Sequence, residues 1–142
     1  MDRVFRWLIL AAVVGAAAWA VLRWPHLDTV ETGRTPEYPG LRPRDYAAGE
    51  AQVGKAVRAA LDHLGWTFVG AGRGPGGSEI QARARGAVLP LDHEVSIRLQ
   101  RLGSRTRVSV RSRSPSLRWD FGENARQVEK LLAALDTEMG VR

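Results

Sequence analysis

Two serines and an acidic–imidazole triplet have the side-chain types for nucleophilic or acid–base catalysis. Ser112 and Ser114 could act as nucleophiles, and the triplet consists of Asp92, His93 and Glu94. A serine nucleophile needs a base within hydrogen-bond reach, and in many hydrolases it sits on a sharp turn after a strand. On a strand, Asp92 and Glu94 face one side and His93 faces the other, so the triplet forms no local acid–base pair. Catalysis would therefore need partners from elsewhere in the chain.

A second polar group marks the start of a predicted helix. Asp120 has the side chain of a helix N-cap, and Glu123 follows three residues later, as in a capping box. Asn124 is expected to join the arginine–serine turn at residues 111–114 to this helix through backbone hydrogen bonds. An ion pair between Arg111 and Asp120 would fix the same corner. These roles are structural, and the alternative is a ligand site at this corner.

Arginine supplies most of the positive charge and is concentrated in one segment. The chain carries 21 Lys and Arg residues against 15 Asp and Glu, a net charge of +6. Residues 78–118 hold nine arginines and three carboxylates, which accounts for the whole excess. Strand parity places five of these arginines on one side of a sheet, opposite apolar residues. They are Arg83, Arg85, Arg98, Arg107 and Arg111.

This row of arginines predicts an anion-binding face. Its partner would be phospholipid headgroups or an acidic protein. The alternative is a solvated face that Glu79 and Glu94 partly neutralise. Nucleic acid is not predicted as a partner, because the strands that follow Phe68 carry no aromatic side chains on which bases could stack.

Several other chemistries find no support in the composition. Without cysteine the chain forms no disulfide and no thiolate metal site. His26, His63 and His93 lack the spacing of metal ligands, and no cofactor is predicted. Residues 72–77 spell G-x-G-x-x-G, but an alternating strand follows at residues 78–85 where a dinucleotide site requires a helix N-terminus. A flexible hairpin loop is expected there.

Three short runs resemble a known family. The run RSRS at 111–114, the run DFGEN at 120–124 and the run LDHEV at 91–95 are similar to segments of the family of domain of unknown function 1499. The similarity covers residues 45–137. Members are small bacterial and plant proteins, often membrane-anchored or exported, and the resemblance implies no established activity. Many members begin with an Asn-Cys-Val-Ser segment that this chain lacks.

The first residues predict a membrane anchor. Residues 7–22 carry no charge, with Arg3 and Arg6 before them and Arg23 after them. The run is slightly short of the roughly 30 Å hydrocarbon core of a bilayer, and tryptophans flank it. The positive-inside tendency puts Arg3 and Arg6 in the cytoplasm and the remaining chain on the periplasmic or extracytoplasmic side. The alternative is a cleaved signal peptide with Ala-Trp-Ala at 18–20, which would release a secreted protein.

The pattern after this segment predicts a linker and one domain. Residues 25–44 contain four prolines and read as an extended linker, and residues 45–142 as the folded domain. Apolar periodicity predicts a helix, four strands and a second helix, at 45–64, 66–69, 78–85, 93–100, 106–111 and 120–139. The expected fold class is α+β: a four-stranded antiparallel meander with two helices on one face, in the order αββββα, preceded by one N-terminal transmembrane helix.

Two functional hypotheses follow. The first is a membrane-anchored, non-catalytic accessory or binding domain outside the cytoplasm, which contacts anionic groups through its basic sheet face. The second is a small exported enzyme of unknown reaction with a site near Asp92, Asp120, Ser112 and Ser114. An enzyme needs a pocket in which such polar groups converge, and a binding domain does not.

Overall fold

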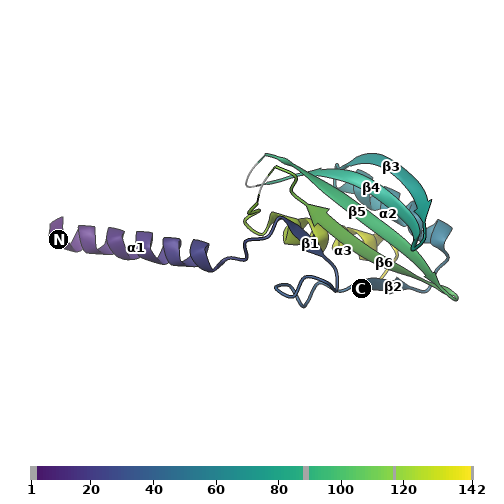
Figure 1. Cartoon of the computed structure of the whole chain (residues 1–142), viewed down its shortest axis with the longest axis horizontal. Coiled ribbons are helices and arrows are strands. Elements are labelled where there is room, and N and C mark those ends of the chain that lie inside the picture. Colours follow the sequence, from purple (N-terminus) through teal and green to yellow (C-terminus); the bar gives the residue numbers. More distant parts are fainter. Residues whose placement is uncertain (1–2, 88–89, 117, 142) are drawn as a thin grey trace.

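The computed structural model describes residues 3–87, 90–116 and 118–141. It shows an α+β protein with one antiparallel sheet, a helix that projects from the domain, and two helices packed on the sheet (Figure 1). The projecting helix, α1, spans Arg3–Arg23 and buries no side chain. It is long and apolar enough to cross a membrane, and a signal sequence has the same features.

Four long strands form a meander, and two short strands complete the sheet. The spatial order is β1-β6-β5-β4-β3, and β2 also pairs with β6, on the edge where β1 pairs. Every pairing is antiparallel. The strands are β1 Thr29–Glu31, β2 Arg44–Tyr46, β3 Thr67–Gly74, β4 Gly77–Arg85, β5 Asp92–Leu102 and β6 Arg105–Arg113.

The sheet therefore has six strands instead of the four predicted, and the element order differs accordingly. Of the two additional strands, β1 lies inside the segment predicted as an extended linker and β2 starts at its last residue; each is only three residues long. Three residues are too few to show a period of two, and both strands are specified by the open edge of β6. The first helix of the domain, α2, starts at Glu50 and not at residue 45, because Asp45 and Tyr46 belong to β2.

Helices α2 (Glu50–His63) and α3 (Glu123–Glu138) lie on one face of the sheet, as predicted (Figure 1). They also contact each other. Their apolar stripes meet the inward side chains of β4, β5 and β6. The main contributors are Val53, Val57, Leu61, Ile80, Val95, Ile97, Leu99, Val108, Val110, Val128, Leu131 and Leu135. Burying such side chains stabilises the fold by about 1.5–3 kcal/mol each. The opposite face of the sheet is left to solvent.

The glycine-rich run predicted as a flexible loop is mostly paired strand. β3 and β4 continue to the pair Gly74–Gly77, so the turn is only Pro75 and Gly76. Gly77 has a φ of 114°, and a Cβ there would lie 2.1 Å from the carbonyl oxygen of Leu99. Only glycine fits at such a close backbone approach. The predicted bend at residues 86–91 includes positions 88 and 89, which lie outside the described residues.

Candidate functional sites: a buried polar corner and an exposed arginine face

A hydrogen-bonded cluster joins the start of β5, the end of β6 and the start of α3. We call His93, Ser112, Ser114, Asp120 and Asn124 the polar corner; none is more than 4% exposed. Ser112 Oγ donates to Asn124 Oδ1 at 2.7 Å, and His93 Nδ1 lies 3.0 Å from the same oxygen. Asn124 Nδ2 donates to Ser114 Oγ at 2.8 Å and to the carbonyl oxygen of Asp28 at 2.9 Å. The corner thus joins four separate segments of the chain.

Asn124 is the centre of this network because it uses all of its hydrogen-bonding capacity. Its carbonyl oxygen receives two contacts, and its amide nitrogen donates twice. A side-chain amide has two donors and two lone pairs, so none is left over. The sequence predicted that Asn124 joins the arginine–serine turn to the helix, and it does so through its side chain instead of its backbone.

The same network assigns the proton on His93. Asn124 Oδ1 is an acceptor, so Nδ1 of His93 must carry a hydrogen to make a favourable contact at 3.0 Å. Ser114 Oγ also lies 3.0 Å from Nδ1. With a proton on Nδ1, this nitrogen has no lone pair that could remove the hydroxyl proton of Ser114. Among the described residues, the other ring nitrogen, Nε2, has no hydrogen-bond partner.

Asp120 organises the start of α3, but not as its N-cap residue. Its two carboxylate oxygens accept the N–H groups of Gly122 at 2.9 Å and Asn124 at 2.8 Å. The helix begins at Glu123, so Gly122 occupies the N-cap position. In a capping box, the carboxylate of Glu123 would accept the backbone N–H of Asp120. Here that N–H donates to the carbonyl oxygen of Leu27. Asp120 therefore satisfies two N–H groups at the helix start.

Two sequence-predicted partners lie on the wrong side of the sheet. Arg111 is exposed, whereas its neighbour Ser112 and the carboxylate of Asp120 are buried, so the predicted ion pair with Asp120 is wrong. Asp92 is also exposed, and its carboxylate lies 3.8 Å from Arg83. It faces away from His93 because successive residues of a strand point to opposite faces. The corner contains the predicted serines, Asp120 and Asn124, together with a histidine that strand parity had set aside.

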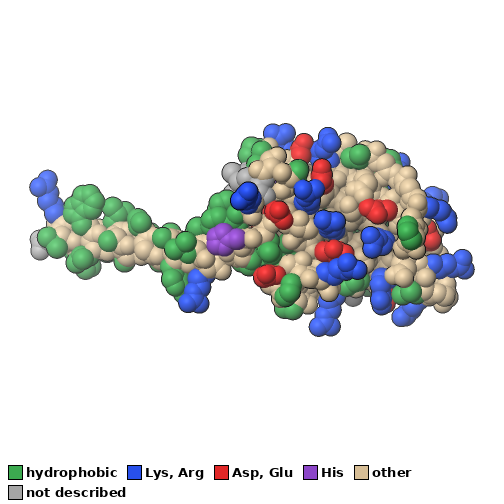
Figure 2. Space-filling view, viewed as in Figure 1, with side chains coloured by type: hydrophobic (Ala, Val, Ile, Leu, Met, Phe, Trp, Pro, Cys, Tyr) green, Lys and Arg blue, Asp and Glu red, His purple; other side chains and the backbone are tan. Residues whose placement is uncertain are grey.

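The five predicted arginines do share the solvent side of the sheet. Each is exposed and alternates with buried apolar residues on β4, β5 or β6. We call this surface, which also includes Arg113, the arginine face. Figure 2 shows blue and red side chains interspersed over it. Whether it binds anions remains a prediction.

Carboxylates are interleaved with most of these arginines. Arg107 makes a two-pronged contact with Asp45, at 2.7 and 2.8 Å, and this hydrogen bond lowers the pKa of Asp45. Arg113 lies 3.9 Å from Glu94, and Arg85 is the cross-strand partner of Asp92. The surface is therefore far less positive than the arginine count alone suggests.

One part of the arginine face holds two arginines that form no close ion pair with a described carboxylate. Within the described chain, neither Arg98 nor Arg111 has a carboxylate oxygen within 4.0 Å. Both line a hollow of about 130 Å³, together with Ser96 and Ser109. Glu31, Glu79 and Arg34 line the same hollow. Glu31 is the cross-strand partner of Arg111, and Glu79 is that of Arg98. Two guanidinium groups and two hydroxyls give the hollow donors for a carboxylate or phosphate group.

A third polar contact fixes β2 to α3, and nothing in the residue spacing predicts it. Tyr46 Oη donates to Asp136 at 2.6 Å, and Arg44 lies 3.3 Å from the same carboxylate. Burial raises the pKa of Tyr46, and its hydrogen bond to Asp136 raises it further. The partners are separated by 90 residues, so this is a tertiary contact and not a local motif.

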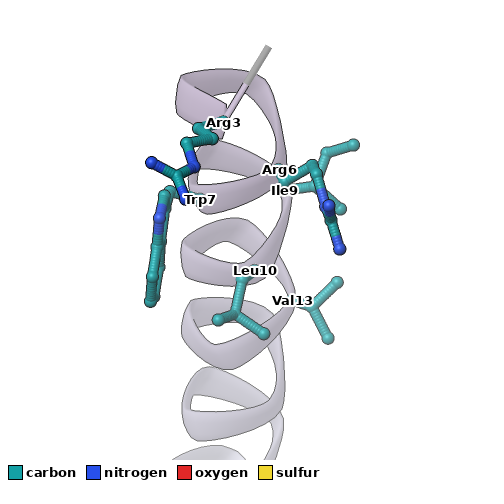
Figure 3. Close-up of a pocket in the computed structure, with 6 residues that line it drawn as sticks. All are labelled: Arg3, Arg6, Trp7, Ile9, Leu10 and Val13. Carbon is teal, nitrogen blue, oxygen red and sulfur yellow. The ribbon is translucent and has the colours of Figure 1, made fainter. Parts of the chain in front are cut away.

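Two further features of the described chain concern ligands, namely the arrangement of possible metal-binding side chains and the hollow on α1. Across the described ranges, no three His, Asp or Glu side chains converge as ligands. The hollow on α1 is not a ligand cavity either. Figure 3 shows Arg3, Arg6, Trp7, Ile9, Leu10 and Val13, all carried by this one helix. No other described element closes over them.

The fold and its surfaces define a class: a small α+β domain behind an N-terminal apolar helix, with an internal polar corner and a charged open sheet face. The chain belongs to the family described as protein of unknown function (DUF1499), whose model matches residues 20–135. The match runs from the end of α1 into α3, so it includes β1 and β2 as well as the segment that carries the resemblance. No curated protein matches the chain.

Proposed function

We propose that this protein is a membrane-anchored, non-catalytic binding or accessory domain that lies outside the cytoplasm. The observation that carries the proposal is α1: it is 21 residues long, and none of its side chains is buried against the domain. A soluble helix with so little polar surface would normally be covered by protein, and a bilayer would cover it equally well. Arg3 and Arg6 on one flank favour the orientation with the domain outside.

The polar corner supports a non-catalytic role. Ser112 and Ser114 are 0% and 4% exposed, so a substrate could reach neither hydroxyl without displacing the end of β6 or α3. Nδ1 of His93 is committed to Asn124 and cannot serve as the base for Ser114. These features make the exported-enzyme alternative the weaker of the two hypotheses.

The arginine face supports a binding role, with an acidic protein as the partner. In Figure 1 this side of the sheet is turned to the viewer while α1 runs across the view. If α1 spans the membrane, a short connection to the domain would keep the plane of the sheet roughly along the membrane normal. The arginine face would then not lie flat on the bilayer. An acidic protein surface next to the anchor could reach it more easily than the headgroups could. The hollow between Arg98 and Arg111 would receive a carboxylate.

Membrane fractionation with protease protection tests the anchor. We expect a tagged protein to remain in membranes through high-salt and carbonate washes, because an inserted helix does not depend on screened charges. Protease added outside the cytoplasmic membrane should degrade the domain. A soluble mature form that begins near Val21 would show that α1 is a cleaved signal peptide.

Titration with polyglutamate tests the face. The full-length protein in nanodiscs of zwitterionic lipid should bind the peptide at low salt and lose binding as salt rises. Changing both Arg98→Gln and Arg111→Gln should weaken binding more than the double change Arg42→Gln and Arg73→Gln, which removes the same charge elsewhere. If the wild type fails to bind at low salt, the face is only a solvated surface. If the embedded protein binds added anionic nanodiscs but does not bind polyglutamate, lipid is favoured as the partner.

A further inference from the structure

The connection between α1 and the domain is short and docked. We call residues 24–28 the neck. The N–H of Trp24 still donates to the carbonyl oxygen of Ala20, at 3.1 Å, so the helical path continues to this residue. Three residues later the carbonyl oxygen of Leu27 accepts the N–H of Asp120 at 3.1 Å. Even fully extended, this step spans only about 10 Å.

Asp28 completes the docking. Its carbonyl oxygen accepts the N–H of Ser114 at 2.7 Å and the side-chain amide of Asn124 at 2.9 Å. The neck is thus held by hydrogen bonds to the buried polar corner and to the N–H groups beside it. The loop between β6 and α3 is consequently the part of the domain next to α1, whereas the β5–β6 hairpin lies at the far end (Figure 1).

Side chains of the neck also pack against the domain. Gly122 has a φ of 76°, and a Cβ on it would lie 2.8 Å from Nε1 of Trp24. The absence of a side chain at Gly122 therefore leaves room for the Trp24 indole. His26 lies against Trp119, and Trp119 stacks on Phe121, with both pairs of ring centroids 4.3 Å apart. The aromatic rings hold the neck and the β6–α3 loop together.

The composition of this end suits the headgroup layer of a bilayer. Trp24 remains 40% exposed beside Arg23, and Arg118 is exposed next to Trp119. Tryptophan concentrates at membrane–water interfaces, and an arginine near a helix end can extend its charged group to the headgroup region. The headgroup layer on each side of a bilayer is about 5–7 Å thick, which is comparable to the reach of the neck. A domain docked so close to a spanning helix has no room to stand clear of the lipid.

We propose that the α1-proximal end of the domain, formed by the neck and by residues 114–116 and 118–122 of the β6–α3 loop, rests on the headgroup layer of the bilayer that receives α1. Its partner is the lipid surface, with the tryptophans and Arg118 in the interfacial region. This inference rests on the proposed membrane anchor. It implies a domain held in one orientation at the membrane and not one that moves on an extended linker.

Site-directed spin labelling tests the proposal on the full-length protein, because the chain contains no cysteine that would compete for the label. Single cysteines are introduced as Val13→Cys in α1, Ser116→Cys in the β6–α3 loop and Ser104→Cys in the β5–β6 hairpin. All three positions are exposed. Each labelled protein is reconstituted in phosphatidylcholine bilayers. Collision of the label with a water-soluble nickel complex and with lipid-soluble oxygen is then measured, and thermal melting checks that each variant folds.

We expect the label at position 13 to collide mainly with oxygen and the label at 104 mainly with nickel. The label at 116 should collide with nickel severalfold less than the label at 104. If 116 is as accessible to nickel as 104 while 13 is shielded, the docked end is wrong and the anchor stands. If 13 itself is accessible to nickel, the anchor fails.

A lengthened neck separates tether length from other causes of shielding. Inserting a Gly/Ser segment of about ten residues between Arg23 and Trp24 adds enough chain to lift the domain off the bilayer. The nickel accessibility at 116 should then rise toward that at 104, with no change at 13. Continued shielding at 116 would overturn the claim that the short neck sets the position of the domain.

Discussion

The polar corner and the arginine face are built from the same strands and differ in which side of the sheet they occupy. On β6, Arg111 and Arg113 are exposed, while Ser112 between them is fully buried. In the corner, polar atoms lie 2.7–3.0 Å from their partners and are shielded from water. On the face, five carboxylates neighbour the arginines in a loose and solvated pattern. A hydrogen bond inside the protein is expensive to lose, and a surface ion pair is not.

This difference indicates which region stabilises the fold and which is free to adapt to a partner. The corner joins β5, β6, α3 and the neck, so its loss should be felt as a loss of stability. The arginine face can change with little effect on folding and is therefore free to be adapted to a partner. Four experiments test this division.

The largest effect is expected from Asn124→Ala. The change removes the acceptor of Ser112 Oγ and His93 Nδ1 and the side-chain donor to Ser114 Oγ and Asp28. A buried group that is left unsatisfied costs about 1–3 kcal/mol. We expect a loss of about 3–5 kcal/mol in the free energy of unfolding, measured by urea denaturation. Glu129→Ala, at an exposed position of the same helix, is the matched control. Equal stability of the two variants would contradict the central role of Asn124.

A smaller loss is expected from Asp120→Ala. Two N–H groups at the start of α3 lose their acceptor, and removing such a group typically costs about 0.5–2 kcal/mol. Asp120→Asn keeps one oxygen and should recover part of the loss. A melting curve for Asp120→Ala that coincides with the wild type would show that the carboxylate does not support the helix. Loss of a binding activity with intact stability would instead reveal a ligand site.

Almost no effect on stability is expected from the triple change Arg83→Gln, Arg98→Gln and Arg107→Gln. Each surface pair contributes about 0–1 kcal/mol, and only Arg107 has a close two-pronged partner. The variant should unfold within about 1–2 kcal/mol of the wild type. Unfolding at neutral pH would break the contrast between the two regions, because it would place essential interactions on the arginine face.

The smallest effect concerns the pH dependence of the Asp45–Arg107 pair. The hydrogen bond from Arg107 lowers the pKa of Asp45 in the folded protein. At acidic pH the folded state therefore binds fewer protons at this carboxyl group than the unfolded state does. The stabilisation is fully present above the ordinary carboxyl pKa of about 3.9 and is lost as the pH falls through the lower, folded value. The difference in unfolding free energy between wild type and Asp45→Asn should therefore be constant from neutral pH to about pH 5 and shrink below about pH 4. A difference that grows on acidification would have the wrong sign.

Much of this molecule could be predicted because local patterns carry it. Valine and arginine alternate along β6, and this parity alone predicted which side chains of the strand would be buried. The apolar stripes of α2 and α3 likewise predicted the helices and the face that they cover. In each case the spacing of apolar residues within one strand or helix shows which of its sides is buried. The hydrophobic effect buries that side whichever element packs against it.

The tertiary structure decided the contacts between residues that are distant in the chain. Asn124 meets His93 across 31 positions and Asp28 across 96, and no spacing within a strand or a helix relates them. The strands β1 and β2 are too short to carry a pattern and exist because β6 offers unpaired backbone groups. Their position turns a proline-rich segment into part of the sheet and shortens the path from α1 to the domain. Buried hydrogen-bond donors and acceptors require partners, and only the folded chain determines which ones they find.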